Sequence, residues 1–363
     1  MYRDLDVAEL AARLGTADEP FVLDVREPAE CAAWAIPGAT NVPVGQLAAR
    51  VDEVPVDREV VTVCASGSRS ATAAEILSGT GRRVANLVGG MAAWAGVYDA
   101  VTMEFGDVRV VQVRRRGKGC LSYVVGVGDT AFVVDPSADV DVYRQVAEEH
   151  GWTVTRVFDT HLHADHLSGA RDLSAVTGAS LHLNPADAFE FPYVPLRDGD
   201  AFELPGGVSF RVAAMHTPGH TRGSTVYVVA ERAVLTGDTL FVEGVGRPDL
   251  ADRAVEFAHS LYHSLHDKVL CLADEAVVLP GHYGDDVVVR PDRPVAATLG
   301  ELRSALEPLG FDEDAFVSWA TAAAVPRPPN YVEIVQANSG RSAVPLAVLR
   351  SLELGPNRCA VSA

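Results

Sequence analysis

The stretch Asp159-Thr160-His161-Leu162-His163-Ala164-Asp165-His166 holds three histidines and two aspartates within eight residues. It follows the apolar run Val154 to Phe158, a predicted strand, and precedes Leu-Ser-Gly, a turn that leads into a predicted helix. Residues two apart in an extended loop point the same way, so His161 and His163 can face one point while Asp165 and His166 turn toward a neighbouring one. Burying so many polar side chains would be costly without a metal ion. The stretch therefore predicts a metal-binding loop at the end of a strand.

Three shorter motifs follow at the ends of predicted strands: His216-Thr217-Pro218-Gly219-His220-Thr221, Thr236-Gly237-Asp238-Thr239 and Leu279-Pro280-Gly281-His282-Tyr283. In this order the four motifs resemble the metallo-β-lactamase superfamily. The resemblance implies an αββα sandwich with the metal site at one edge of its two sheets. His216 is expected to support the loop of His220. Other histidines are expected to be surface residues or hydrogen-bonded core residues, namely His150, His182, His259, His263 and His266.

Within this superfamily the chain looks most like the persulfide dioxygenases, over residues 119–123, 160–171 and 238–250. By that resemblance one Fe(II) per chain is held by His161, His220 and Asp238, which leaves coordination positions open for O2 and a substrate sulfur. An arginine near the thiol-carrier substrate corresponds to Arg247. The resemblance also implies groups that hydrogen-bond the ligands and bound water, namely His163, Asp165, His166 and His282.

A dinuclear zinc thioesterase of the glyoxalase II type is the alternative, because the full set of seven ligands for two Zn(II) per chain is present. In that mechanism a bridging Asp238 and a metal-bound hydroxide attack a thioester. A third interpretation is a degenerate sulfur-sensing or docking module. The intact Cys64, Arg69 and metal set argue against it.

A second loop, Cys64-Ala65-Ser66-Gly67-Ser68-Arg69-Ser70, lies between a predicted strand and a predicted alanine-rich helix. Backbone N–H groups and the positive end of the helix favour an anion there. With Arg69 they would lower the pKa of Cys64 and make its thiolate nucleophilic. Gly67 permits a corner with positive φ. Further hydrogen bonds can come from Ser66, Ser68 and Ser70.

This loop and its flanks, residues 23–28, 36–43 and 86–94, resemble the rhodanese family of sulfurtransferases. The resemblance implies that Cys64 carries a persulfide and that the loop cradles the sulfur donor or acceptor. Trp34-Ala35 depart from the Gly-His that the family often has. A tyrosine-phosphatase-like loop would have five residues between Cys and Arg rather than four, and a buried inert Cys64 is the remaining alternative. Structural roles are expected for Asp24 and Arg26, as an ion pair, and for Cys31, Cys120, Cys271 and Cys359.

The order of predicted elements gives the fold class. Strands alternate with helices in the first hundred residues, which predicts a small parallel α/β domain. The later part is richer in strands and predicts two sheets flanked by helices, followed by helices at Glu301–Leu306 and Glu313–Ala323 and a turn at Pro326–Pro329. We therefore predict a rhodanese-like α/β domain at 1–100, a metallo-β-lactamase sandwich at 101–295 and a helical C-terminal extension at 296–363, packed on the sandwich. The predicted strands are Phe21–Val25, Val60–Val63, Val84–Leu87, Val108–Val113, Leu121–Val127, Ala131–Val134, Val154–Phe158, Val208–Val212, Thr225–Val229, Ala233–Leu235 and Ala276–Leu279; the earlier predicted helices are Ala71–Leu77, Val142–His150 and Val255–Leu265.

The composition and net charge of the chain limit the classes of partner that it can bind. The 363 residues carry 30 Lys and Arg against 49 Asp and Glu, a formal charge of -19, which argues against nucleic acid and anionic membranes as partners. No run offers the ~20 apolar residues of a membrane span, and the start lacks the apolar region of a secretory signal. Five scattered cysteines fit a reducing compartment. The sequence thus predicts a cytoplasmic protein, and a homo-oligomer is compatible with it.

The fusion of the two domains favours the dioxygenase, because a rhodanese domain handles the sulfane sulfur that a persulfide dioxygenase oxidises, whereas a thioesterase gains nothing obvious from it. Tethering would raise the local concentration of a reactive intermediate. The sequence therefore predicts a bifunctional enzyme with a thiol persulfide, O2 and sulfite or thiosulfate as its small-molecule partners. The thiol carrier and the direction of sulfur transfer stay open.

Overall fold

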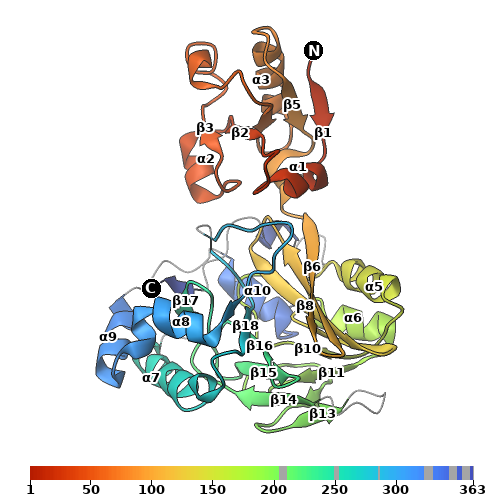
Figure 1. Cartoon of the computed structure of the whole chain (residues 1–363), viewed down its shortest axis with the longest axis vertical. Helices are drawn as coiled ribbons and strands as arrows, with labels where there is room; N and C mark the ends of the chain where they lie inside the picture. The colour runs from red at the N-terminus through yellow and green to blue at the C-terminus, as the bar shows by residue number, and fades with distance from the viewer. Residues whose placement is uncertain are drawn as a thin grey trace.

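The computed structural model describes residues 1–203, 211–248, 253–284, 287–322, 330–342, 350–353 and 360–362. A small body built from the first hundred residues stands on a larger body that contains the other sheets and helices (Figure 1). The predicted fold class is confirmed: a parallel α/β domain precedes a two-sheet sandwich with a helical C-terminal region.

The small domain has one parallel sheet of five strands in the order β1-β5-β4-β2-β3. The mostly apolar, entirely β-branched run of β4 is buried at every position, as suits a central strand of a parallel sheet. Parallel strands end at the same edge, so the chain segments after β2 and β4 lie together there. The strands are β1 (Arg3–Leu5), β2 (Phe21–Asp24), β3 (Thr40–Asn41), β4 (Val60–Val63) and β5 (Val84–Leu87), and the helices are α1 (Val7–Arg13), α2 (Pro28–Ala33), the 3-10 helix η1 (Val51–Glu53), α3 (Ser68–Ser78) and α4 (Gly90–Trp94).

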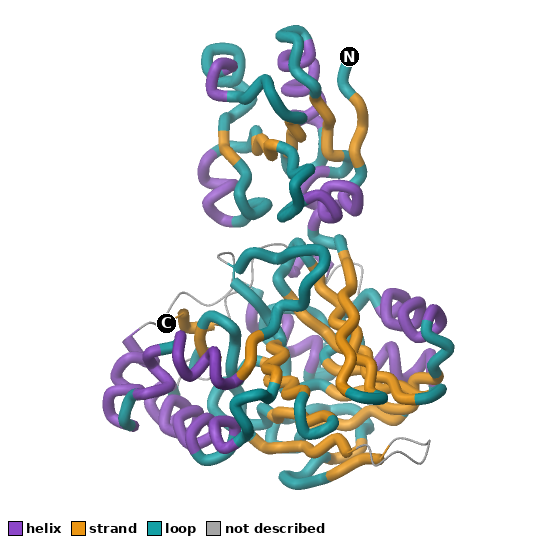
Figure 2. The backbone as a smooth tube through the Cα atoms, viewed as in Figure 1, coloured by secondary structure: helices purple, strands orange, loops and turns teal. Residues whose placement is uncertain are grey.

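The large domain packs two sheets face to face, with strands in the middle and helices on the outside (Figure 2). Its seven-stranded sheet has the order β12-β11-β10-β9-β8-β7-β6 and its six-stranded sheet the order β13-β14-β15-β16-β18-β19. The first sheet comprises β6 (Tyr98–Phe105), β7 (Val108–Arg115), β8 (Cys120–Val127), β9 (Thr130–Val134), β10 (Thr153–Phe158), β11 (Ser180–Leu183) and β12 (Val194–Pro195). The second comprises β13 (Ala201–Glu203), β14 (Arg211–His216), β15 (Thr225–Val229), β16 (Ala233–Gly237), β18 (Val277–Pro280) and β19 (Ala297–Thr298), and β17 (Gly244–Gly246) pairs with β20 (Ala360–Ser362).

Three apolar layers hold this domain together. Tyr123, Phe158 and Tyr227 belong to the layer between the sheets. Tyr143 of α5 and Leu173 of α6 pack on the outer face of the first sheet, and helices α7 to α9 cover the second. The helices are α5 (Val140–Glu149), α6 (Ala170–Thr177), α7 (Ala254–His266), α8 (Leu299–Ala305), α9 (Glu313–Ala322) and α10 (Tyr331–Asn338), with 3-10 helices η2 (Val269–Cys271), η3 (Glu307–Gly310) and η4 (Arg350–Glu353).

One strand spans the first predicted domain boundary, and the second sheet continues past the other through β19. Strand β6 runs through residues 100 and 101 and pairs with β7, while β19 lies beyond residue 295 and pairs with β18. Two predictions lie wholly outside the described residues, the turn Pro326–Pro329 and Cys359, and two lie partly outside, at residues 208–210 of one strand and at Ala323 of one helix. None of the helices in the described ranges combines the length and apolar character that crossing a membrane requires.

The two domains are docked through the turn between β7 and β8. The Trp34 indole N–H donates to the carbonyl of Gly117 at 2.9 Å. The N–H of Arg116 donates to the carbonyl of Val97 at 2.9 Å, and the Arg115 Nε–H donates to that of Ala95, also at 2.9 Å. The Trp34-Ala35 departure from the rhodanese pattern thus places a side chain on the neighbouring domain.

Candidate functional site

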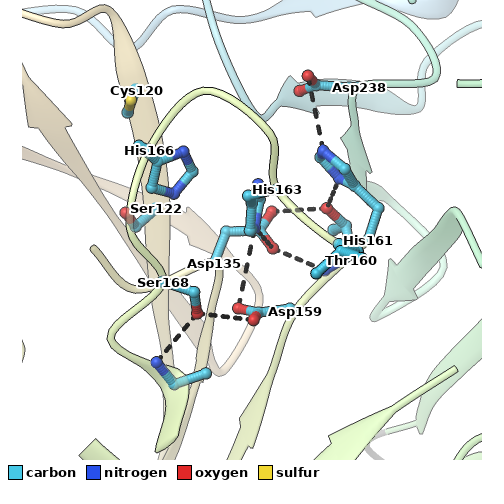
Figure 3. Close-up of polar contacts among 12 residues, drawn as sticks. Cys120, Ser122, Asp135, Asp159, Thr160, His161, His163, His166, Ser168 and Asp238 are labelled. Carbon is cyan, nitrogen blue, oxygen red and sulfur yellow. Dashed lines mark hydrogen bonds and ion pairs between the residues drawn. The ribbon is translucent and has the colours of Figure 1, made fainter. Parts of the chain in front are cut away.

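The metal-binding loop predicted from the sequence begins where β10 ends, and a relay of hydrogen bonds orients its first histidine. The Thr160 hydroxyl donates to Asp135 Oδ2 at 2.9 Å and lies 2.9 Å from His161 Nδ1 (Figure 3). Because the single hydroxyl proton goes to Asp135, the Thr160 oxygen accepts the proton on His161 Nδ1. The other ring nitrogen, Nε2, then keeps its lone pair for a metal ion.

Three predicted ligands converge although they are far apart in the sequence. Asp238 Oδ2 lies 3.7 Å from His161 Nε2 and 3.4 Å from His220 Nε2. The His220 Nδ1–H donates to the carbonyl of Arg247 at 3.1 Å, so its Nε2 also keeps a lone pair. All three atoms are buried and have no hydrogen-bond partner among the described residues. Buried polar atoms normally have partners, and two imidazoles with one carboxylate are a donor set that suits a metal ion.

The protonation states of His161 and Asp238 suit the binding of a cation. Burial holds the pKa of His161 well below its usual value, so its imidazole is neutral. Burial alone would raise the pKa of Asp238, but the neighbouring His282 and His161 lower it, so the carboxylate is ionised. Metal ligation requires both of these protonation states.

A second cluster lies beside the first. His282 Nδ1 is 2.6 Å from Asp238 Oδ1 and His282 Nε2 is 2.9 Å from Asp165 Oδ2, so His282 joins the two clusters. His166 Nδ1 lies 3.2 Å from Asp165 Oδ1. Cys120, expected to be structural, belongs to this cluster, with its sulfur 4.0 Å from Asp165 Oδ2.

The placement of Cys120 adds a possible metal ligand to the structural role expected from the sequence. Cys120 begins β8 and forms an isolated bridge with His282, which brings the two residues together from opposite sheets. Burial would raise the pKa of the Cys120 thiol, but His166 and His282 lower it to about 6. The match of residues 119–123 to the persulfide dioxygenase pattern was the one signal in the sequence that pointed to this position.

His163 was expected to support the ligands, and its ring lies beside that of His161, with 4.2 Å between the centroids. Its Nε2 is 3.1 Å from Asp135 Oδ1. Its Nδ1 is buried without a hydrogen-bond partner among the described residues. His163 therefore has the free nitrogen that a ligand needs.

The cysteine loop of the small domain connects β4 to α3. The Cys64 sulfur accepts hydrogen bonds from the N–H of Gly67 at 3.2 Å and from the Ser70 hydroxyl at 3.4 Å. Burial opposes ionisation of Cys64, yet hydrogen bonds from Ser70 and from backbone N–H groups lower its pKa below the usual value. The loop therefore stabilises a thiolate, as the anion-binding argument predicts.

Glycines let the chain close tightly around this cysteine. Gly67 has φ 101°, which provides the corner predicted for it. Gly90 has φ 57°, and a Cβ atom there would lie 2.2 Å from the carbonyl oxygen of Cys64. That carbonyl accepts from the N–H of Met91 at 2.8 Å, and the N–H of Ala92 donates to Ala65 at 3.0 Å. The loop is thus held to the start of α4.

The other residues singled out from the sequence differ in their burial and in their contacts. Arg69 forms a bidentate ion pair with Glu30 of α2, at 2.7 and 2.8 Å, a contact that the sequence did not indicate. Ser66 and Ser68 are exposed at the mouth of the loop. The Arg247 side chain is 1 % exposed, so a substrate would meet it only inside the protein. The predicted ion pair of Asp24 and Arg26 is present and buried, at 2.6 Å.

Comparisons with known proteins agree with this geometry. The sequence model of the metallo-beta-lactamase superfamily matches residues 115–282, and that of the rhodanese-like domain matches residues 6–96. An uncharacterized protein of Mycobacterium tuberculosis is 34% identical over 208 residues, which cover 48% of this chain and 90% of that protein. A hydroxyacylglutathione hydrolase of Acidiphilium cryptum is 35% identical over 163 residues, 44% of this chain and 63% of the hydrolase.

Two solved structures extend the comparison. ETHE1 from Myxococcus xanthus is 27% identical, with a TM-score of 0.57, and the match covers 64% of this chain and 99% of ETHE1. A metallo-beta-lactamase from Staphylococcus aureus, at 23% identity and a TM-score of 0.60, shares the fold over 65% of this chain and 74% of its own. The chain therefore belongs to the metallo-β-lactamase superfamily and contains a rhodanese-like domain ahead of its metal-binding sandwich.

Proposed function

We propose that this protein is a bifunctional sulfur enzyme, a persulfide dioxygenase joined to a sulfurtransferase. The observation that carries the proposal is the presence, in one chain, of a hydrogen-bonded cysteine in an anion-stabilising loop and of a buried cluster of two histidines and one aspartate. The similarity to ETHE1 over nearly its whole length supports this assignment.

At the metal centre, His161, His220 and Asp238 would hold one Fe(II), whose bound form supplies the redox chemistry with O2. The net reaction is R-S-SH + O2 + H2O → R-SH + H2SO3, in which the terminal sulfur is oxidised by four electrons and O2 is reduced by four. Thr160 and the carbonyl of Arg247 keep the two imidazoles in the tautomer that leaves Nε2 free. The burial of the cluster excludes bulk water from the reactive sulfur.

At the cysteine loop, the Cys64 thiolate attacks the sulfane sulfur of thiosulfate. The S–S bond of thiosulfate breaks, sulfite leaves with the bonding electron pair, and Cys64 retains the sulfur as a persulfide. Hydrogen bonds from Gly67 and Ser70 stabilise the anionic sulfur before and after transfer. A thiol or sulfite then accepts the sulfur and regenerates Cys64.

A zinc thioesterase is the second candidate, and two specific observations favour it. The hydrolase relative is 35% identical in this region. The structure also offers a complete second cluster, Asp165, His166 and His282, and a His163 Nδ1 that has no hydrogen-bond partner in the described part of the chain. Cys120 at that cluster supplies a soft sulfur ligand that Zn(II) accepts.

Metal analysis and paired assays decide between the two. The protein is purified without oxygen, its iron and zinc are measured, and O2 uptake with glutathione persulfide is compared with cleavage of a hydroxyacylglutathione thioester. About one iron per chain with persulfide-dependent O2 uptake supports the dioxygenase. Two zinc ions per chain with thioester cleavage and no O2 uptake refute it.

The sulfurtransferase is tested separately with Cys64→Ser. Sulfur transfer from thiosulfate to cyanide should be lost while O2 uptake with glutathione persulfide continues. Cys31→Ser is the matched control, because Cys31 lies in the same domain but its sulfur contacts the Asn41 amide rather than the loop. Transfer that survives in Cys64→Ser would show that Cys64 is not the sulfur carrier.

A further inference from the structure

The backbone of the metal-binding loop is held by side chains from the C-terminal extension. Asn338, the last residue of α10, donates from Nδ2 to the carbonyls of His163 at 2.9 Å and His166 at 2.7 Å. Its Oδ1 accepts from the N–H of Ser168 at 3.0 Å. The nitrogen and the oxygen of the Asn338 amide therefore both bind the main chain, on either side of Asp165.

Glu353, in η4, holds the same loop at Leu167, the residue between His166 and Ser168. Its Oε1 accepts from the N–H of Leu167 at 2.7 Å. The carboxylate also forms a bidentate pair with Arg115, at 2.9 and 3.3 Å, and both side chains are buried. Arg115 in turn donates to the carbonyl of Ala95, at the end of α4 in the small domain.

These contacts meet a specific need of the loop. Residues 161–168 form no helix or regular strand, so their buried N–H and C=O groups lack the partners that regular structure supplies. A buried ion pair is costly to form and is weak evidence for stability alone. Here each charged group also makes a backbone hydrogen bond, one to the loop and one to the small domain, which fixes the position of both.

We propose that Asn338 and Glu353 are positioning residues that hold the loop backbone so that its histidines and Asp165 point at the metal centre. Both residues lie beyond the stretch that the superfamily model matches. Arg115 anchors Glu353 to the small domain. The C-terminal extension therefore holds the metal-binding loop as well as covering the second sheet, and this holds whichever reaction the metal performs.

Metal affinity tests the proposal without depending on turnover. Zn(II) binding to the metal-free full-length chain is measured by competition with a chromophoric chelator, and the visible absorption spectrum of the Co(II) form reports ligand geometry. Loss of a group that orients ligands typically weakens metal binding 10- to 100-fold. Asn338→Ala and Glu353→Gln are each expected to raise the Zn(II) Kd by about tenfold or more and to alter the Co(II) spectrum.

Asn338→Asp separates hydrogen bonding from packing. The variant keeps the shape of the side chain and the acceptor for Ser168 but loses both N–H donors and places a carboxylate against two carbonyls. Positioning by hydrogen bonds predicts an affinity at least as weak as that of Asn338→Ala, whereas a space-filling role predicts the wild-type Kd. Since this change alters few atoms, it carries the test should Glu353→Gln fail to fold.

Two variants of the same helix serve as matched controls. Glu333→Gln changes an exposed residue of α10 and should leave the Kd unchanged. Ile334→Val removes one methyl group from a buried residue of α10, which lowers stability while leaving every side-chain hydrogen bond of Asn338 in place. The proposal is overturned if Asn338→Asp keeps a Kd within about twofold of wild type, or if Ile334→Val weakens binding as much as Asn338→Ala does.

Discussion

Replacing Thr160 with valine should weaken metal binding while preserving the shape of the site. The Thr160 hydroxyl lies between two buried groups, 2.9 Å from Asp135 Oδ2 and 2.9 Å from His161 Nδ1. Valine keeps the branched outline of threonine but has no polar atom. In the variant, Asp135 Oδ2 loses a donor and His161 Nδ1 loses its acceptor.

The size of the effect follows from the tautomer of His161. In the wild type the proton stays on Nδ1 because Thr160 accepts it, and Nε2 is free to bind metal. Without that acceptor the Nε2–H tautomer becomes populated, and it must be given up when the metal binds. Loss of such an orienting contact lowers metal affinity about 10- to 100-fold, which corresponds to about 1.4–2.7 kcal/mol.

Thr160→Ser is the control, because serine keeps the hydroxyl and loses only a methyl group. Competition with a chelator gives the Zn(II) Kd of the three proteins, and circular dichroism at the metal-free stage checks that they fold. The Zn(II) Kd is expected to be lowest for the wild type, close to that value for Thr160→Ser and highest for Thr160→Val. Equal affinities for the valine and serine variants would refute the role of the hydroxyl in fixing His161.

Three further predictions concern the cysteine loop and the metal. Gly90→Ala would place a Cβ atom 2.2 Å from the Cys64 carbonyl oxygen, at a residue with φ 57°. The variant should lose at least ~2 kcal/mol of unfolding free energy and its sulfur transfer, while its metal content is unchanged. Normal sulfur transfer in this variant would contradict the prediction. Ser70→Ala removes a hydrogen bond that lowers the pKa of Cys64, so the midpoint of the pH dependence of iodoacetamide alkylation should move to higher pH, which an unchanged midpoint would disprove. Chelation should lower the melting temperature and added Zn(II) should restore it by mass action. Asp238→Ala should abolish that response, and a metal-dependent melting shift that persists in it would argue against this carboxylate as a ligand.

The elements that could be predicted from the sequence are those whose signal is local. The strand Val60–Val63 has its predicted limits because four consecutive β-branched residues, three of them valine, are buried in the middle of a parallel sheet. The helix after the cysteine loop begins at Ser68, earlier than predicted, because Gly67 adopts the left-handed conformation that starts it. The ligand motifs were recognisable because each occupies a short turn at the end of a strand.

The parts that sequence reasoning missed depend on contacts between distant segments. Cys120 enters the metal centre only because β8 lies beside the chain at His282 in the folded protein. Asn338 and Glu353 approach the loop from 170 or more residues away, and neither stands in a pattern that marks a function. The pairing of Arg69 with Glu30 joins two helices of the small domain in the same way. Side chains of these types are common on protein surfaces, so their presence in the sequence does not by itself indicate a functional site.

The docking of the two domains limits how sulfur can pass between them. Only residues 95–97 separate α4 from β6, and Arg115 and Trp34 fix the domains across the turn between β7 and β8. Cys64 is 1 % exposed, and its carbonyl is bound by the N–H of Met91, so the cysteine is not on a mobile arm. Under the proposed function, fusion would act through a raised local concentration of a shared reactant rather than through movement of Cys64. Sulfur exchange between the sites would therefore use a small diffusing thiol, and a bifunctional reaction in the intact chain should depend on the concentration of that thiol.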